Sequence, residues 1–544
     1  MVLSMFDACR HHSQGLVGES EQFDISGSVF FISSSGRVLQ LPIPSNSPRD
    51  PLTWSWKKRL GAFMAIQFYS VVASFELTTP GVLDHAMELE FNPETIKPFS
   101  IASLSSVITL FTGLGFLLSI PISTSVGRRP VFLAAAAITT ISTLWAGLSG
   151  DFVQLLIAVC LQAIAAGSAI SMCQLIILDA TFIHERPFAL SIYWCSGGAI
   201  VKLFYILLPF TTDLQTKWRP VYDVWFGMCL LSFVLTLLFV PESFFLRPPV
   251  ALDGRVLVQS GTETVHIYDD WSDLSCSTNQ KPLPDIPPTN TIGNRLKITQ
   301  APGTTWRSLP AAYMQMILCR CNPLILWVAL LNASILTGVI LLGLTQPGIL
   351  LSPPWNQDPA MMSIYLGVSG MVGALLALPV TGPLITWSIR YFALRSNGTR
   401  HAEVYLPGFV PPVVSAFSSV VLFYLALQNQ WPPPWHYAAS ALSVFSYTSG
   451  NVAFVLWMTE AFPSLAAAAL ALFMFVTNMV SFGVGALILT ALNDDCITKP
   501  SLAIMCIIVG LGVVAVPVSF WGEAARQYIH GRPGSTEKTA LRPQ

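Results

Sequence analysis

The chain has 544 residues, of which 53% are hydrophobic and only 10% are charged, and its formal net charge is −1. This composition is far too apolar for a soluble enzyme of this size, and it indicates a membrane protein.

Apolar runs long enough to cross a bilayer occur twelve times in the chain. A hydrocarbon layer about 30 Å thick needs roughly 20 mostly apolar residues per helix. Six runs precede a long polar stretch and six follow it, so the predicted fold class is an all-α membrane protein with twelve transmembrane helices. The predicted spans are 60–82, 99–120, 130–148, 152–178, 188–210, 222–241, 323–350, 360–385, 407–428, 435–458, 465–491 and 500–521.

Polar segments divide the chain into five predicted parts. A Ser-rich tail covers residues 1–59, and a linker rich in Pro, Asp, Ser and Thr covers 243–322. Because "KPLPDIPPTN" within the linker disfavours a helix, we expect short amphipathic pieces there and no packed core. Six-helix bundles are predicted at 60–242 and 323–521, and a second tail at 522–544.

Positive charge is distributed unevenly over the predicted loops. If both termini are cytoplasmic, 23 of the 28 lysines and arginines fall in cytoplasmic segments. Only four fall on the other side, and one, Lys202, lies within a span. Because lysine and arginine are retained on the cytoplasmic side during insertion, both termini and the linker are predicted to be cytoplasmic.

The same short motif appears twice, after the second span of each half. "PISTSVGR" begins at Pro121 and "PLITWSIR" begins 262 residues later, at Pro383. Each has a Pro, a Thr three positions on, and an Arg four positions after that. Internal repeats are typical of secondary transporters, whose substrate site lies near the bilayer midplane between two halves. The two bundles are therefore predicted to be pseudo-symmetric.

The stretch "IPISTSVGRR" resembles the signature of the major facilitator superfamily, roughly G-x-x-x-D-R-x-G-R-R. Gly127, Arg128 and Arg129 match, whereas Ile120 and Thr124 stand where Gly and Asp are expected. Other pieces are similar to a fungal subgroup grouped with drug and polyamine proton antiporters. These pieces are "SSSGRVLQLPIPSNSPRDPLTWSWKKR", "HERPFALSIYW", "VPESFFLRP", "DGRVLVQSGTE" and "AEVYLPGF". The resemblance implies a major facilitator fold and proton-coupled transport.

One departure from that subgroup lies in the fifth span. Antiporters of the subgroup usually carry Gly-Pro pairs in this span. Here, "WCSGGAIVKLFYILLPF" has a Gly197-Gly198 pair, a distant Pro209 and a lysine. Family membership is therefore better supported by the residues than proton-coupled export is.

Basic and acidic residues at the cytoplasmic ends of the spans are candidates for a gate. The repeated arginines are expected to hold helix ends of the opposite half when the protein is closed to the cytoplasm. The alternative is that they serve topology alone, and that the acids at the ends of the fourth and tenth spans are caps. The candidate gate residues are Thr124, Gly127, Arg128, Arg129, Asp179, Thr386, Arg390 and Glu460.

Two ionisable residues, Glu76 and Lys202, lie deep within predicted spans. At 1.5 Å per residue, they lie roughly 24 Å and 21 Å from the cytoplasmic ends of their helices. Their similar depth suggests a buried ion pair, in which Glu76 binds the coupling proton and Lys202 competes with it. Alternatively, Glu76 reaches the outer interface and Lys202 snorkels.

The resemblance implies that spans 1, 4, 7 and 10 line the substrate cavity, and helical spacing then selects faces. Gln67 lies about half a turn from Glu76 and is excluded from this face. An apolar cavity that contains a small number of amides suits a lipophilic or amphipathic molecule. Each amide can instead serve helix packing. The candidate cavity residues are Tyr69, Glu76, Gln174, Lys202, Asn332, Gln346, Tyr447 and Asn451.

The favoured function is alternating-access transport of a small organic molecule, such as a drug, secondary metabolite or polyamine, across the plasma membrane. The resemblance implies efflux by proton antiport. A non-transporting nutrient sensor with the same fold is the alternative, and a membrane enzyme is disfavoured because no catalytic constellation appears. We expect a monomer in the lipid bilayer, with no cofactor, metal or nucleic-acid partner.

Overall fold

A computed structural model describes residues 29–30, 50–91, 96, 100–101, 103–211, 216–245, 306–395, 399–493 and 498–530. Within these ranges, twelve helical segments are long and apolar enough to cross a membrane, which confirms the predicted fold class. Most of the predicted N-terminal tail and linker, and the end of the C-terminal tail, lie outside the described residues.

The first half contains six spanning segments and a short helix that extends the first of them. Its helices are α2 (Trp56–Thr78), α3 (Pro80–Glu90), α4 (Ser103–Val126), α5 (Arg128–Gly147), α6 (Phe152–Ala180), α7 (Arg186–Thr211) and α8 (Arg219–Phe239). A 3-10 helix, η1 (Pro51–Thr53), precedes them.

The second half repeats this order. Its helices are α13 (Pro323–Leu351), α14 (Pro359–Arg395), α15 (Val410–Gln428), α16 (Pro433–Ala461), α17 (Ala466–Asn493), α18 (Thr498–Val513) and α19 (Ala515–His530). Two 3-10 helices, η3 (Ala402–Phe409) and η4 (Pro463–Leu465), join them. Strand β1 (Val29–Phe30) pairs antiparallel with β2 (Thr399–Arg400).

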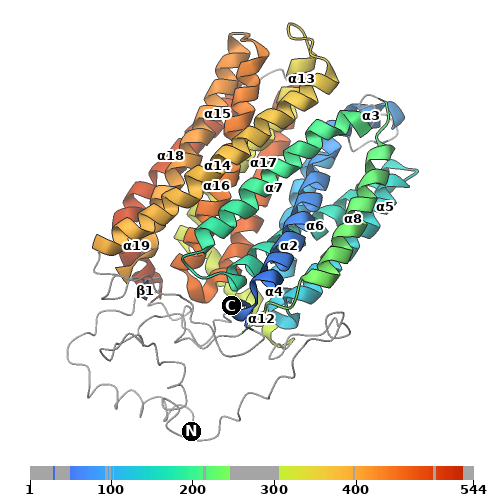
Figure 1. The fold of residues 1–544 in the computed structure, drawn as a ribbon. Coiled ribbons are helices and arrows are strands. Elements are labelled where there is room, and N and C mark those ends of the chain that lie inside the picture. The colour runs from blue at the N-terminus through green and yellow to red at the C-terminus, as the bar shows by residue number, and fades with distance from the viewer. Residues whose placement is uncertain are drawn as a thin grey trace, which may run out of the picture.

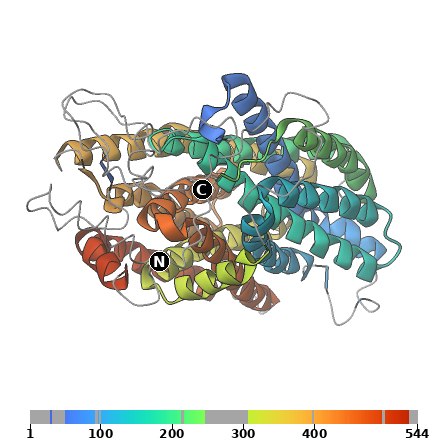
Figure 2. The same ribbon diagram turned by 90° about the horizontal axis from the view of Figure 1, so that it is seen from below.

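The two halves stand side by side. Helix α4 packs against α17, and α7 packs against α16. Helix α7 also packs against α14 (Figure 1). The view from below shows the halves as adjacent groups (Figure 2). We call the end of the bundle at which α4 and α16 end and α7 begins the basic end, because Arg128, Arg186 and Arg390 lie there.

Close packing within each half depends on glycine at equivalent helix crossings. A Cβ atom at Gly167 of α6 would lie 2.2 Å from the Thr112 carbonyl oxygen of α4. A Cβ atom at Gly373 of α14 would lie 2.1 Å from the Ala441 carbonyl oxygen of α16. Membrane helices associate largely through such small-residue contacts, which let their backbones approach closely.

Two helices continue past the prolines of the repeated motif, which the sequence pattern placed at or near span ends. Helix α4 runs through Pro121 to Val126, and α14 runs through Pro379 and Pro383 to Arg395. Prolines are tolerated in membrane helices because neighbouring groups satisfy the freed backbone atoms. The turn after α4 is made by Gly127, whose φ of 110° favours glycine.

A further helix, α12 (Ser308–Arg320), lies in the segment predicted to have no packed core. It packs between α4 and α17 at the basic end, where Ala312, Met316 and Cys319 are buried. A short helical piece of the predicted kind is therefore present, and its packing against the bundle was not predicted.

Candidate functional site

Polar and aromatic side chains of α7 contact α2 of the first half on one side and α16 of the second half on the other. Gln67 Nε2 donates to the Tyr193 carbonyl oxygen at 3.3 Å, and the hydroxyls of Ser70 and Tyr193 are 2.8 Å apart. The rings of Trp194 and Tyr447 meet edge to face, with centroids 6.0 Å apart. We call Gln67, Ser70, Tyr193, Trp194, Tyr447 and Asn451 the interface cluster.

Several buried polar atoms of this cluster have no hydrogen-bond partner among the residues the structure describes. They are Gln67 Oε1, Trp194 Nε1 and Asn451 Oδ1, although Asn451 Nδ2 donates to the Tyr447 carbonyl oxygen at 2.8 Å. In Gln174 of α6, both amide atoms lack a described partner. Because buried polar groups are normally paired, these atoms are candidate ligand contacts.

The sequence analysis did not select Gln67 or Ser70, because it chose the face of the first span that carries Glu76, and it did not select Tyr193 or Trp194 of the fifth span. Tyr447 and Asn451 were predicted and do lie in the cluster, but Gln67 was excluded. The i, i+3 spacing of Gln67 and Ser70, together with aromatic residues in "SIYWCSGG", was the available signal.

Glu76 and Lys202 do not form the predicted ion pair. Glu76 accepts hydrogen bonds from Thr143 of α5 and from Cys229 of α8, whose Sγ lies 3.2 Å from Oε1. Lys202 Nζ instead lies 4.6 Å from the ring centroid of Tyr205 on its own helix. Equal depth in the membrane does not make two side chains face each other.

Three other predicted cavity residues make hydrogen bonds within their own half. The hydroxyl of Tyr69 lies 2.7 Å from Thr139 Oγ1, and Asn332 Nδ2 donates to Thr477 Oγ1 at 3.4 Å. Gln346 Nε2 donates to the His436 carbonyl oxygen at 2.6 Å. These contacts match the alternative interpretation of such residues as helix-packing groups.

Arg128 and Arg129 make ion-pair and hydrogen-bond contacts within their own half. Arg128 is fully buried, and its Nε and Nη2 lie 2.9 Å and 3.3 Å from the two carboxylate oxygens of Asp179. Its backbone N–H and that of Arg129 donate to Glu242 at 3.0 Å and 3.2 Å. Burial raises the pKa of Glu242, and these donated bonds oppose the rise. These contacts join helix ends within the first half.

An ion pair between Arg186 and Glu460 links the halves at the basic end. Arg186 Nη1 lies 2.7 Å from Glu460 Oε1, and both side chains are largely buried. Glu460 was predicted as a gate residue, but Arg186, at the start of α7, was not. Its position in "HERPF", directly before the apolar run of the fifth span, was the available signal.

The other predicted gate residues make weaker or local contacts. Thr124 and Thr386 donate to carbonyl oxygens of their own helices, at Pro121 and Gly382. Arg390 is exposed and lies near His184 of the opposite half, whose pKa is lowered by burial and further by the arginine charge.

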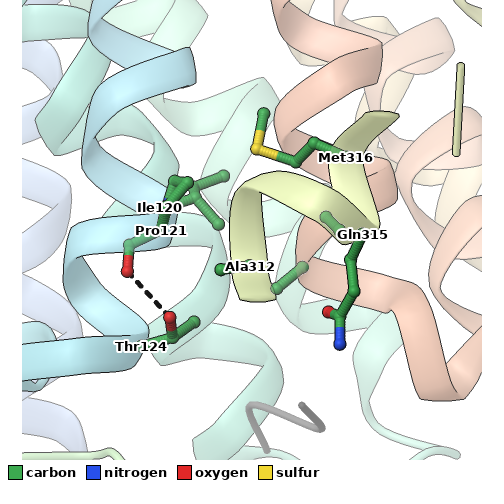
Figure 3. A pocket seen from close by; sticks show the side chains of 8 residues that line it. Ile120, Pro121, Thr124, Ala312, Gln315 and Met316 are labelled. Carbon is green, nitrogen blue, oxygen red and sulfur yellow. Dashed lines mark hydrogen bonds between the residues drawn. The ribbon is translucent and has the colours of Figure 1, made fainter. Parts of the chain in front are cut away.

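A small pocket lies at the basic end between α4, α12 and α17 (Figure 3). Its volume of about 10 Å³ is enough for about one water molecule, so it is not a substrate site. It is lined by Ile120, Pro121, Thr124, Ala312, Gln315, Met316, Ala467 and Ala468.

We expect loss of the Arg186–Glu460 pair to favour opening at the basic end. Hydrogen bonds to charged groups contribute about 1.5–3 kcal/mol, and 1.4 kcal/mol corresponds to about tenfold in an equilibrium. A maleimide should therefore label Ala312→Cys at least about tenfold faster in the Arg186→Ala variant. For this measurement, serine replaces the exposed Cys321 and Cys506 and also Cys9, Cys276 and Cys496, which lie outside the described residues.

Charge exchange provides the control for this prediction. Arg186→Glu and Glu460→Arg should each increase labelling, and the double variant should restore the slow rate. Unchanged labelling in the single variants would remove this pair from the gate.

Comparison with known proteins identifies relatives over most of the chain. The model of the Major Facilitator Superfamily matches residues 61–486. Protein HOL1 of Saccharomyces cerevisiae is 20% identical over 546 residues, which cover 91% of each chain. A vitamin B6 transporter of Schizosaccharomyces pombe is 24% identical over 208 residues, covering 37% of this chain and 38% of its own.

A solved structure is similar in fold. The proton:xylose symporter XylE, bound to 6-bromo-6-deoxy-D-glucose, matches with a TM-score of 0.58 and 13% sequence identity. The match covers 90% of this chain and all of that chain. At this identity, the similarity concerns the fold alone.

Proposed function

The chain belongs to the Major Facilitator Superfamily, and from that premise we propose that it moves a small amphipathic organic molecule by alternating access. It is a multi-pass membrane protein whose relatives include transporters. The interface cluster is the proposed substrate contact, and the Arg186–Glu460 pair is the proposed gate at the basic end.

The observation that carries this proposal is the set of buried polar atoms without a described partner in the interface cluster, which reaches from α2 through α7 to α16. Counted from the basic ends of their helices at 1.5 Å per residue, Gln67, Trp194 and Asn451 lie roughly 12 to 17 Å deep. That depth is near the middle of a hydrocarbon layer about 30 Å thick. The rings of Tyr193, Trp194 and Tyr447 beside unpaired amide and indole groups suit a ligand with an apolar body and a few polar groups.

Proton coupling is proposed to act through Glu76. Thr143 has a single hydroxyl proton and two acceptors within reach, Glu76 Oε1 and the Thr139 carbonyl oxygen at 2.7 Å. If the Glu76 carboxyl group holds a proton, it can donate a hydrogen bond to the Thr143 hydroxyl. Thr143 can then donate its own hydroxyl proton to the Thr139 carbonyl oxygen. This role of Glu76 does not depend on Lys202.

The proposed substrates are drugs or secondary metabolites in preference to polyamines. The interface cluster contains no carboxylate to bind an ammonium group. We further propose a monomer in the plasma membrane with the basic end facing the cytoplasm, exporting its substrate in exchange for protons.

Transport into membrane vesicles tests the proposed site. Labelled organic compounds are screened for uptake that depends on this protein, and a transported compound is then measured with cluster variants. Gln67→Leu and Asn451→Leu should each raise KM about tenfold, as expected for a lost buried hydrogen bond. Tyr69→Phe, which alters a contact within the first half, should leave KM unchanged. A KM that responds only to Tyr69→Phe would reject the interface cluster as the site.

A further inference from the structure

Lys202 lies on the face of α7 that meets the second half. Trp194, Gly198 and Lys202 follow each other at four-residue spacing and so share one helix face. Trp194 meets Tyr447 of α16. A Cβ atom at Gly198 would lie 3.1 Å from Thr448 Cγ2, which is also on α16. This face connects the interface cluster with Lys202.

Glycines of α14 make room for the lysine side chain at the contact between the halves. A Cβ atom at Gly370 would lie 3.0 Å from Cγ, Cδ and Cε of Lys202, and one at Gly367 would lie 3.0 Å from the Lys202 carbonyl oxygen. The apolar stem therefore runs along the backbone of the opposite half rather than along lipid.

The ammonium group rests beside an aromatic ring that is held in place. The hydroxyl of Tyr205 donates to the Thr78 carbonyl oxygen at 3.1 Å, and Ser363 Oγ donates to the Tyr205 carbonyl oxygen at 3.1 Å. The hydroxyl bond holds the ring beside Lys202 Nζ, and the Ser363 bond ties the backbone of α7 to α14 at the same level.

This cation lacks an anionic partner among the residues the structure describes. No carboxylate of the described ranges forms an ion pair with Lys202, and Glu76 is bound by Thr143 and Cys229. The free-energy cost of placing a cation within the membrane is larger than the stabilisation from a single cation–π contact. An anion supplied from outside the chain would complete the site.

We propose that Lys202 binds a carboxylate of the substrate, so that the transported molecule is an amphipathic organic anion. This inference rests on the proposed function, because the apolar body of the molecule would occupy the interface cluster. Lys202 lies eight positions after Trp194, so the carboxylate lies roughly 12 Å from the cluster, away from the basic end.

Three probes of one shape and different charge test this inference. They are 6-(2-naphthyl)hexanoate, its primary amide and 6-(2-naphthyl)hexylammonium. Affinities are measured by calorimetry on the full chain in phosphatidylcholine nanodiscs, which contain no anionic lipid. The carboxylate should bind at least about tenfold more tightly than the amide, as expected when one partner of a desolvated charge pair is removed. The ammonium probe should bind more weakly than the amide.

Variants locate the charge preference. Lys202→Gln should make the carboxylate and the amide bind equally, Lys202→Arg should retain the preference, and the matched control Lys499→Gln should not change it. Equal affinities in the wild-type protein, or a preference that survives Lys202→Gln, would overturn the inference.

The two proposals fail in different ways. If all probes bind equally but Asn451→Leu weakens them, the interface cluster stands and the role of Lys202 falls. If the charge preference depends on Lys202 but no cluster variant changes any affinity, the cluster is not the site of the apolar body.

Discussion

Glu76→Gln is expected to abolish proton-driven accumulation of substrate while leaving the fold intact. Glutamine has nearly the same shape, and its amide can donate to Thr143 as a protonated carboxyl group does, but it cannot release a proton. Proteoliposomes with an imposed pH gradient measure the effect as loss of uptake against a concentration gradient. Exchange of substrate at equal concentrations should continue.

An infrared measurement separates protonation from transport. The wild-type protein should show a protonated carboxyl band that is absent in Glu76→Gln and present in the control Glu88→Gln, which changes an exposed acid of α3. Concentrative, proton-driven uptake by Glu76→Gln would remove this residue from the coupling mechanism.

Hydropathy was sufficient to predict the spans because length and apolar content are local properties. The ends of helices were harder to predict. The pattern ended the eighth span at residue 385, but α14 continues to Arg395 through Pro383. The packing of helix α12 could not be predicted because its buried face is defined by α4 and α17, which are distant in the sequence.

The direction in which each polar residue points could not be predicted from depth alone. Glu76 and Gln67 lie on opposite faces of α2, and the sequence favoured the charged residue as the more informative one. In the structure, Glu76 faces α5 and α8, whereas Gln67 faces α7. Only the packing of neighbouring helices decides which face meets the other half.

The repeated motif predicted symmetry correctly at the level of the fold but not at the level of contacts. Arg128 and Arg390 occupy equivalent positions, yet Arg128 is fully buried against Asp179 and Arg390 is exposed. The acid equivalent to Asp179 is Glu460, which pairs with Arg186 across the halves. A substitution at each repeated arginine should therefore have a different effect.

Arg128→Ala is expected to destabilise the protein severely. Removing one partner of a buried ion pair leaves the other charge buried without compensation, at a cost of about 3–5 kcal/mol. Because domains are stable by only about 5–15 kcal/mol, most of this variant should fail to accumulate in the membrane. Thermal unfolding of the purified protein and the amount in membranes measure the effect.

Arg390→Ala is the matched control at the equivalent position of the second half. Because Arg390 is exposed, its substitution should change stability by no more than about 0.5 kcal/mol. The double variant Arg128→Met/Asp179→Leu should recover much of the lost stability, since apolar residues of similar volume often replace a buried pair without loss. If Arg128→Ala instead remains as stable as the wild type and exposes the basic end to labelling, Arg128 holds the gate between the halves as the sequence predicted.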